Sequence, residues 1–199
     1  MDLPEPDLEQ FALTLFEIDA VRLGQFRLHS GIMSPIYLDL RMLVSYPKAL
    51  RLATAVYRRL LSNLEFDLVA AAPLAGLPLA TAVCLAMEKP LIYPRKTAKS
   101  YGTGKGIEGA FQIGQTAVVL DDLITSGDSI LQAIVALKAV GLQVQDAVVL
   151  VDREQGGVAN LLADGYRLHA AMTIRQVLDI LEDHKRISAA EKARVLKNL

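Results

Sequence analysis

The chain has 199 residues, 52% of them hydrophobic, and a formal net charge of −1. This length and apolar content suit one globular domain with a buried core and exclude a disordered chain, and the near-neutral charge argues against a dedicated nucleic-acid surface. The acidic N-terminus contains no signal-peptide pattern, and the single cysteine, Cys84, cannot form an intramolecular disulfide, so we expect a cytoplasmic protein.

Short β-rich runs alternate with helical patterns after an N-terminal segment of about 45 residues. Near-continuous apolar strands separated by helices predict an α/β domain with a mostly parallel central sheet covered by helices on both faces. The chain contains no Pro/Ser-rich linker, which favours a single domain over residues 1–199. We expect strands at 35–41, 66–72, 90–95, 116–121, 145–152 and 166–172, and helices at 46–64, 79–88, 129–141 and 188–199.

Two helix starts have recognisable capping residues. Asp128 or Ser126 is expected to cap the helix that runs to Gly141. Ser188 and Glu191 have the spacing of a capping box for the last helix.

The stretch VVLDDLITSGDSI, residues 118–130, places two carboxylates at the end of an apolar strand. In open α/β sheets, ligands bind at the carboxyl ends of the strands. Backbone N–H groups of Thr125 to Ser129, at a helix start, suit a phosphate, and Asp121 and Asp122 suit the hydroxyls of a sugar. The alternative is that the aspartates only end a strand and that Ser or Thr only caps a helix. A Walker B strand is excluded because the chain has no G-x-x-x-x-G-K-[ST] loop.

The loop RKTAKSYGTGKGIEG, residues 95–109, carries four cations and four glycines. This composition predicts a lid that closes on a polyanion, although a solvated surface loop is the commoner fate of such charge. The sequence GKGIEG within it matches G-x-G-x-x-G, but it does not directly follow a strand, and we interpret it as a coincidence.

These motifs together resemble a known family. Hydrophobic-hydrophobic-Asp-Asp-x-x-Thr-Ser-Gly is similar to the phosphoribosyl pyrophosphate signature of the type I phosphoribosyltransferases. RKTAKSYGTGK resembles the catalytic loop of the orotate phosphoribosyltransferases, and the likeness extends to residues 24–41, 72–82 and 148–157. The resemblance implies the type I phosphoribosyltransferase fold, with a small N-terminal hood over about residues 1–45.

The resemblance also implies roles for individual residues. Asp121 and Asp122 would hold the ribose hydroxyls, with Lys99 the third catalytic residue. Orotate would contact Arg153, Thr125 and backbone groups of Tyr37 and Leu38. The remaining phosphoribosyl pyrophosphate contacts would come from His29, Leu74, Ala75, Arg95, Lys96, Tyr101, Leu123, Ile124, Thr125, Ser126, Gly127, Asp128 and Ser129. For Arg153 the alternative is a surface ion pair.

The implied reaction transfers a phosphoribosyl group to N1 of orotate and releases pyrophosphate, in the synthesis of uridine monophosphate. The family implies Mg²⁺, bound mainly through the substrate without a confident direct protein ligand, and a homodimer with shared active sites. Neither a nucleic acid nor a membrane is an expected partner.

Several residues depart from the family pattern or lie outside it. His29 stands where the family commonly has a lysine, and Ala75 where some bacterial members have one. His169 and His184 lack metal-like spacing and are expected to be structural or exposed. Cys84 is expected to be a small core residue.

Three functions remain open at this point. The first is an orotate phosphoribosyltransferase; the second is a related transferase for another base, with His29 marking the altered specificity. The third is a non-catalytic protein that binds phosphoribosyl pyrophosphate and regulates a partner. Because some family members continue into a decarboxylase barrel and this sequence ends before one, we expect the chain to act alone.

Overall fold

The structure, a computed structural model, describes residues 7–27, 31, 33–95 and 106–199. Its helices are α1 (Leu8–Glu17), α2 (Pro47–Leu61), α3 (Gly76–Met87), α4 (Asp128–Ala139), α5 (Gly157–Ala163), α6 (Ile174–Asp183) and α7 (Ala189–Leu196), with a 3₁₀ helix at Leu40–Ser45. Its strands are β1 (Val21–Arg27), β2 (Met33–Leu38), β3 (Leu68–Ala71), β4 (Leu91–Pro94), β5 (Ile107–Glu108), β6 (Thr116–Leu120), β7 (Leu123–Ile124), β8 (Gln143–Asp152) and β9 (Arg167–Thr173).

Five of these strands form the parallel centre of the sheet, in the order β4-β3-β6-β8-β9. β7 extends this arrangement along β8, and β5 pairs antiparallel with β4 at one edge. The predicted mostly parallel sheet is confirmed. The strand order reverses between β3 and β6, and this reversal is the place where open α/β sheets bind their ligands.

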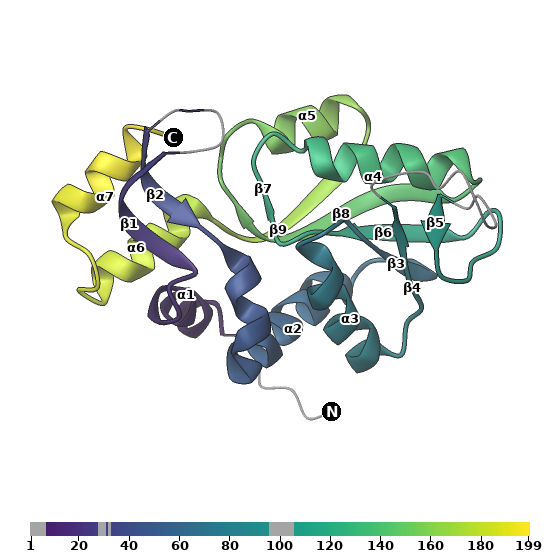
Figure 1. Cartoon of the computed structure of the whole chain (residues 1–199), viewed down its shortest axis with the longest axis horizontal. Helices are drawn as coiled ribbons and strands as arrows, with labels where there is room; N and C mark the ends of the chain where they lie inside the picture. Colours follow the sequence, from purple (N-terminus) through teal and green to yellow (C-terminus); the bar gives the residue numbers. More distant parts are fainter. Residues whose placement is uncertain (1–6, 28–30, 32, 96–105) are drawn as a thin grey trace.

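Helices cover both faces of the sheet, as the continuous apolar strands predict (Figure 1). Every residue of β3 is buried, and so are the last seven residues of β8. α2 and α3 lie on one face and α4 and α5 on the other, each face with its own hydrophobic core. A strand buried on both faces has little freedom to slide, so the loops at its end are held in place.

The N-terminal segment forms a second layer with the C-terminal helices. β1 and β2 make an antiparallel hairpin, α1 packs against α6, and α7 contacts β2 (Figure 1). Phe11 and Leu15 of α1 and Val177 and Leu181 of α6 are fully buried in the same core cluster. The hairpin therefore packs against the C-terminal helices as well as against the neighbouring helix α1.

The predicted side-chain cap of α4 is wrong. Gly127, with φ of 92°, precedes the helix, and no side chain caps its first turn within the described residues. Ser126 Oγ instead donates to Asp128 Oδ2, at 2.7 Å. Because both side chains bond to each other, they leave the first N–H groups of α4 available to a ligand.

Two other local predictions are confirmed. Ser188 and Glu191 form the capping box of α7. Cys84 lies in the core, where burial raises the pKa of its thiol to about 11, as expected for a structural cysteine. Among the described residues, no helix has the length and apolar character needed to cross a bilayer.

Candidate active site

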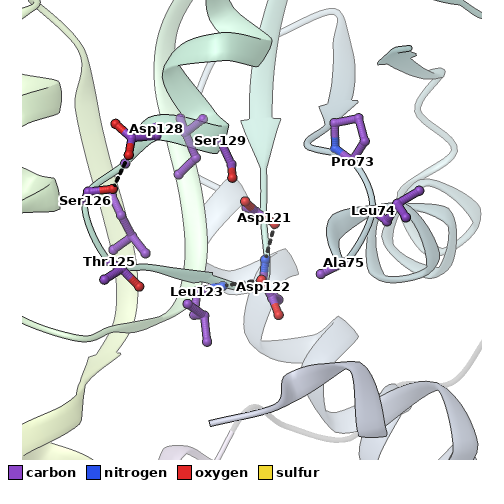
Figure 2. A pocket seen from close by; sticks show the side chains of 13 residues that line it. Pro73, Leu74, Ala75, Asp121, Asp122, Leu123, Thr125, Ser126, Asp128 and Ser129 are labelled. Atoms are coloured by element: carbon purple, nitrogen blue, oxygen red, sulfur yellow. Dashed lines mark hydrogen bonds between the residues drawn. The ribbon is translucent and has the colours of Figure 1, made fainter. Parts of the chain in front are cut away.

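A cavity of about 260 Å³ lies at the carboxyl ends of β3 and β6, at the reversal of the strand order. Its lining comes from two segments, Pro73, Leu74 and Ala75 after β3, and residues 121–130 after β6. Figure 2 shows Asp121 and Asp122 between the segment Pro73 to Ala75 and the turn that begins at Thr125. The structure thus brings together the aspartates and the small-residue turn at the edge of the sheet that the sequence predicts.

The two carboxylates are close to each other, and Asp121 is buried whereas Asp122 is half-buried. Asp121 is 7% exposed and its Oδ1 accepts a hydrogen bond from the Asp122 amide at 2.9 Å; Asp122 Oδ1 accepts one from the Leu123 amide at 2.9 Å. Burial and the neighbouring Asp122 charge raise the pKa of Asp121 to about 8, and burial also raises the pKa of Asp122. Hydroxyl groups that donate hydrogen bonds, or a cation, would stabilise the charged form of such a pair.

The turn that follows is fixed from the side by α5. Asn160 Nδ2 donates to the Ser126 carbonyl at 2.9 Å. A Cβ on Gly157 would lie 2.6 Å from the Thr125 carbonyl and 2.5 Å from Ile124, so only glycine allows this approach. The turn 125–129 is consequently held open toward the cavity, with backbone amides at the N-terminus of a 12-residue helix.

The opposite wall of the cavity, formed by Pro73, Leu74 and Ala75, also lies against the aspartates. The Pro73–Leu74 peptide bond is cis, and α3 begins two residues later at Gly76. A Cβ on Gly76 would lie 2.6 Å from the Leu120 carbonyl and 3.4 Å from Asp121 Cα. Glycine therefore lets the start of α3 approach the end of β6, which places the segment Pro73 to Ala75 against the carboxylates.

Arg153 lies beside the cavity with a buried group that has no partner. Its amide donates to the Ile124 carbonyl at 3.0 Å, next to Thr125. Its side-chain Nε is buried and makes no hydrogen bond to the described residues, and burial lowers the pKa of the guanidinium. The alternative of a surface ion pair does not fit this buried, unpaired donor. A buried cation of this kind suits an anionic ligand group.

Arg95 is near the cavity but occupied. It lines a neighbouring cavity that shares Pro73 and Ser129 with the first, and its Nη1 lies 2.7 Å from Glu108 Oε1. One of the four loop cations therefore has an acidic partner, across the pairing of β4 with β5. Lys96, Lys99, Tyr101 and His29 lie outside the described residues, so the lid and these contacts stay predictions.

Tyr37 and Leu38 lie in β2 of the hairpin, outside the lining of the first cavity. The Arg22 guanidinium stacks 5.1 Å from the Tyr37 ring centre. Arg41 pairs with Asp39 at 2.6 Å, and the charge of Arg41 also acts on Asp122. Tyr37 therefore has two arginines beside it, Arg22 of the hairpin and Arg41 of the following 3₁₀ helix, and Arg41 also influences Asp122.

The histidines take the structural roles that the sequence predicts. His169 Nε2 lies 2.7 Å from Asp146, which also binds Arg167, and His184 Nε2 lies 2.7 Å from Glu9. Neither residue lines the first cavity. In the described part of the chain, no group of three or more His, Cys, Asp or Glu residues could hold a metal ion, so a cation near Asp121 and Asp122 would need further ligands from a substrate.

Sequence reasoning missed three residues that shape the site. Gly76 and Gly157 allow the close approaches described above, and their role depends on neighbours distant in sequence. Tyr57, in α2, donates from its hydroxyl to the Asp121 carbonyl at 2.7 Å. A tyrosine on the apolar face of a helix gives no sequence signal for such a contact, 64 residues away.

Comparisons with known proteins agree with this geometry. The family described as "Phosphoribosyl transferase domain" matches residues 45–161. The chain is 39% identical over 191 residues to the protein named orotate phosphoribosyltransferase from Caenorhabditis elegans, covering 95% of this chain and 84% of that protein. It matches the structure of orotate phosphoribosyltransferase from Aeropyrum pernix with a TM-score of 0.75 and 32% identity, covering 86% of this chain and 98% of that one.

The chain is also similar to part of a longer protein. It is 44% identical over 183 residues to the uridine 5′-monophosphate synthase of Bos taurus, covering 91% of this chain. It spans about two fifths of the length of that relative, 38%.

Proposed function

The chain belongs to the phosphoribosyltransferase family and, within it, to the orotate phosphoribosyltransferases, and on that premise we propose how its residues perform the transfer. The substrates are 5-phosphoribosyl 1-pyrophosphate and orotate, and the products are orotidine 5′-monophosphate and pyrophosphate. This step belongs to the synthesis of uridine monophosphate. We also propose a cytoplasmic location, with which the single free cysteine, Cys84, is compatible.

One observation carries the proposal. A single cavity at the switch point contains a buried and a half-buried carboxylate and the N-terminus of α4, whose first amides no side chain caps within the described residues. The carboxylates suit the ribose 2′- and 3′-hydroxyls. Burial disfavours the charged form of Asp121, and hydrogen bonds that the hydroxyls donate would stabilise it. The amides of residues 125–129 suit the 5′-phosphate. A cavity that offers both kinds of group suits a phosphorylated sugar.

The pyrophosphate of the substrate is assigned to the other wall. Backbone groups of Leu74 and Ala75 line that side of the cavity, and Arg95 lines the adjoining one. We assign Lys96, Lys99, Tyr101 and His29 to the same anion on the resemblance alone. Arg95 would then exchange Glu108 for the pyrophosphate, a substitution of one anionic partner by another.

Orotate is assigned to the side of Arg153 and Thr125. The unpaired Nε of Arg153 would donate to the 6-carboxylate, and backbone groups of Tyr37 and Leu38 would bind the pyrimidine edge. A buried guanidinium nitrogen without a partner among the described residues, as Nε of Arg153 is, would discriminate strongly, because a base that lacks the carboxylate leaves it unpaired. Uracil should therefore bind poorly at this place.

The reaction needs positioning and electrostatics and no covalent nucleophile. As the bond between the ribose C1 and pyrophosphate breaks, positive charge develops on the sugar and negative charge on the leaving group. Asp121 and Asp122 would hold the sugar and place carboxylate oxygens beside the positive charge. On the resemblance, the loop cations would bind the departing anion. The orotate N1 attacks from the side of Arg153. The carboxylate pair fits Mg²⁺ that arrives with the substrate, which would add Lewis-acid stabilisation of the pyrophosphate.

A panel of bases tests the proposed function. With phosphoribosyl pyrophosphate and Mg²⁺ present, pyrophosphate release should be rapid with orotate and at least ~100-fold slower with uracil or purines, because Arg153 requires the carboxylate. Faster release with a purine would establish a transferase for another base. Binding of phosphoribosyl pyrophosphate without release with any base would establish the regulatory protein.

A homodimer with shared sites is part of the proposal, and mixing of variants tests it. Lys99→Ala and Asp122→Ala should each be nearly inactive. After subunit exchange, half the dimers are mixed and one site in each retains both groups, so activity should recover to about a quarter of wild type. Exchange demonstrated by mass spectrometry without any recovery would place Lys99 in the site of its own subunit.

A further inference from the structure

Tyr57 has the largest side chain among the fully buried ones in the described part of the chain. Its hydroxyl contacts the backbone of Asp121, a residue of the candidate active site. Tyr57 lies in α2, with 0% exposure, and donates to the backbone carbonyl of Asp121 at 2.7 Å. No resemblance or motif gives this residue a role. It belongs to the core cluster that α2 and α3 form on one face of the sheet, and it is not among the residues that line the cavity.

The carbonyl that Tyr57 binds is the one that the sheet does not use. At the end of β6 the Asp121 amide donates to Val148, the Leu120 carbonyl accepts from Ala72, and the Asp122 carbonyl accepts from Leu150. The ladder therefore uses the carbonyls before and after that of Asp121. A buried carbonyl without a partner would be costly, and Tyr57 supplies that partner.

The same peptide unit is held at its other polar atom by the carboxylate of Asp121. The Asp122 N–H donates to Asp121 Oδ1 at 2.9 Å. The peptide joining the two aspartates is thus fixed at its oxygen by Tyr57 and at its nitrogen by Asp121. Rotation of this peptide would turn the Asp122 N–H away from Asp121 Oδ1, so its orientation holds the Asp121 carboxylate in place.

We propose that Tyr57 is a positioning residue for the reaction, which holds the Asp121–Asp122 peptide so that the Asp122 N–H keeps the Asp121 carboxylate directed at the sugar. The inference rests on the proposed function. Tyr57 contacts neither substrate; it acts through the backbone of Asp121. Its loss would leave the Asp121 carbonyl free to turn toward another donor, and the Asp122 amide would turn with it.

Tyr57→Phe tests this, with Thr54→Val as the matched control. Thr54 lies in the same helix, is 2% exposed and donates to the Leu50 carbonyl at 2.7 Å, so both changes remove one buried hydroxyl from α2. Tyr57→Phe should lower kcat about tenfold, with the KM for orotate unchanged, and Thr54→Val should leave both near wild type. Equal kinetics for the two variants would reduce Tyr57 to a packing residue and overturn the proposal.

A second measurement requires no turnover. The titration of Asp121, followed by carboxyl ¹³C NMR and assigned with Asp121→Asn, should move to higher pH in Tyr57→Phe, because Asp121 loses the fixed hydrogen bond from the Asp122 amide. Besides the two aspartates themselves, the charged group that acts on the pair is Arg41, through Asp122, and neither variant alters it. An unchanged titration would overturn the inference even in an active enzyme, and a shifted titration in a chain inactive with every base would refute only the proposed function.

The amine of 4-aminophenylalanine at position 57 restores a donor of the same shape. It should recover most of the lost kcat and return the titration toward wild type. Should Tyr57→Phe not fold, the aminophenylalanine chain is compared with wild type directly, and its weaker donor should still lower kcat and raise the Asp121 titration. Identity of the two proteins in both measurements would overturn the proposal.

Discussion

Replacing Arg153 by leucine should lower kcat/KM for orotate by about 100-fold and leave the protein at least as stable as wild type. The two effects have one cause. Nε of Arg153 is buried without a partner among the described residues, so it does not stabilise the free protein through a hydrogen bond. In the complex it would donate a hydrogen bond to the substrate carboxylate. Steady-state kinetics with varied orotate and thermal unfolding measure both effects on the same sample.

Arg167→Leu is the matched control for Arg153. Arg167 donates from two nitrogens to Asp146, at 2.9 and 2.8 Å, and lines a different cavity from the candidate active site. The control should keep the kinetics of wild type and lose a little stability. A wild-type KM and kcat for orotate in Arg153→Leu would show that the arginine does not contact the base, and clear destabilisation would show that it has a structural role.

Asp121→Asn should abolish most activity and raise the stability of the protein at pH 8. The carboxylate is 7% exposed, and its pKa is raised to about 8 by burial and by Asp122, so the folded chain must confine a poorly solvated anion. An asparagine keeps the acceptor for the Asp122 amide without the charge. We expect a gain of about 2 kcal/mol, or several degrees in Tm, and a fall of at least ~100-fold in kcat/KM for phosphoribosyl pyrophosphate.

Asp146→Asn provides the opposite case. Asp146 is 8% exposed, and although burial raises its pKa, the hydrogen bonds from Arg167 and His169 outweigh burial and lower the pKa below the ordinary 3.8. This change should therefore destabilise the protein and leave activity intact. If both asparagine variants lowered Tm, the destabilisation assigned to the buried charge of Asp121 would be wrong; if both raised it, the stabilisation assigned to the partners of Asp146 would be wrong.

The pH dependence of stability should separate the two aspartates as well. Since the pKa of Asp121 is higher in the folded chain than the ordinary 3.8, the folded state binds more protons between about pH 4 and 8. The stability that Asp121 contributes is thus present below pH 4 and is lost as pH rises toward 8. Asp146, with a lowered pKa, contributes stability above its ordinary pKa that is lost as pH falls. The gain from Asp121→Asn should grow from pH 5 to pH 8.

The sequence by itself determined the fold class and the edge of the sheet where the site lies. Apolar strands such as residues 68–71 and 116–120 indicate a sheet covered on both faces. The Asp-Asp pair followed by Thr-Ser-Gly is a local pattern that the sequence shows without reference to distant residues. The error over the cap of α4 has the same origin. Ser126 and Asp128 are suitable capping residues in isolation, but they bond to each other in this turn.

Only the tertiary structure decided what lies against those local patterns. The unpaired Nε of Arg153, the pairing of Arg95 with Glu108, the contact of Tyr57 with Asp121 and the close approach of Gly76 to β6 each depend on segments far apart in sequence. The raised pKa of Asp121 arises in the same way, because burial is a property of the whole packed core. Residue type and spacing determine which hydrogen bonds and charges a segment can offer, whereas desolvation and partner choice are settled only when the helices and strands pack together.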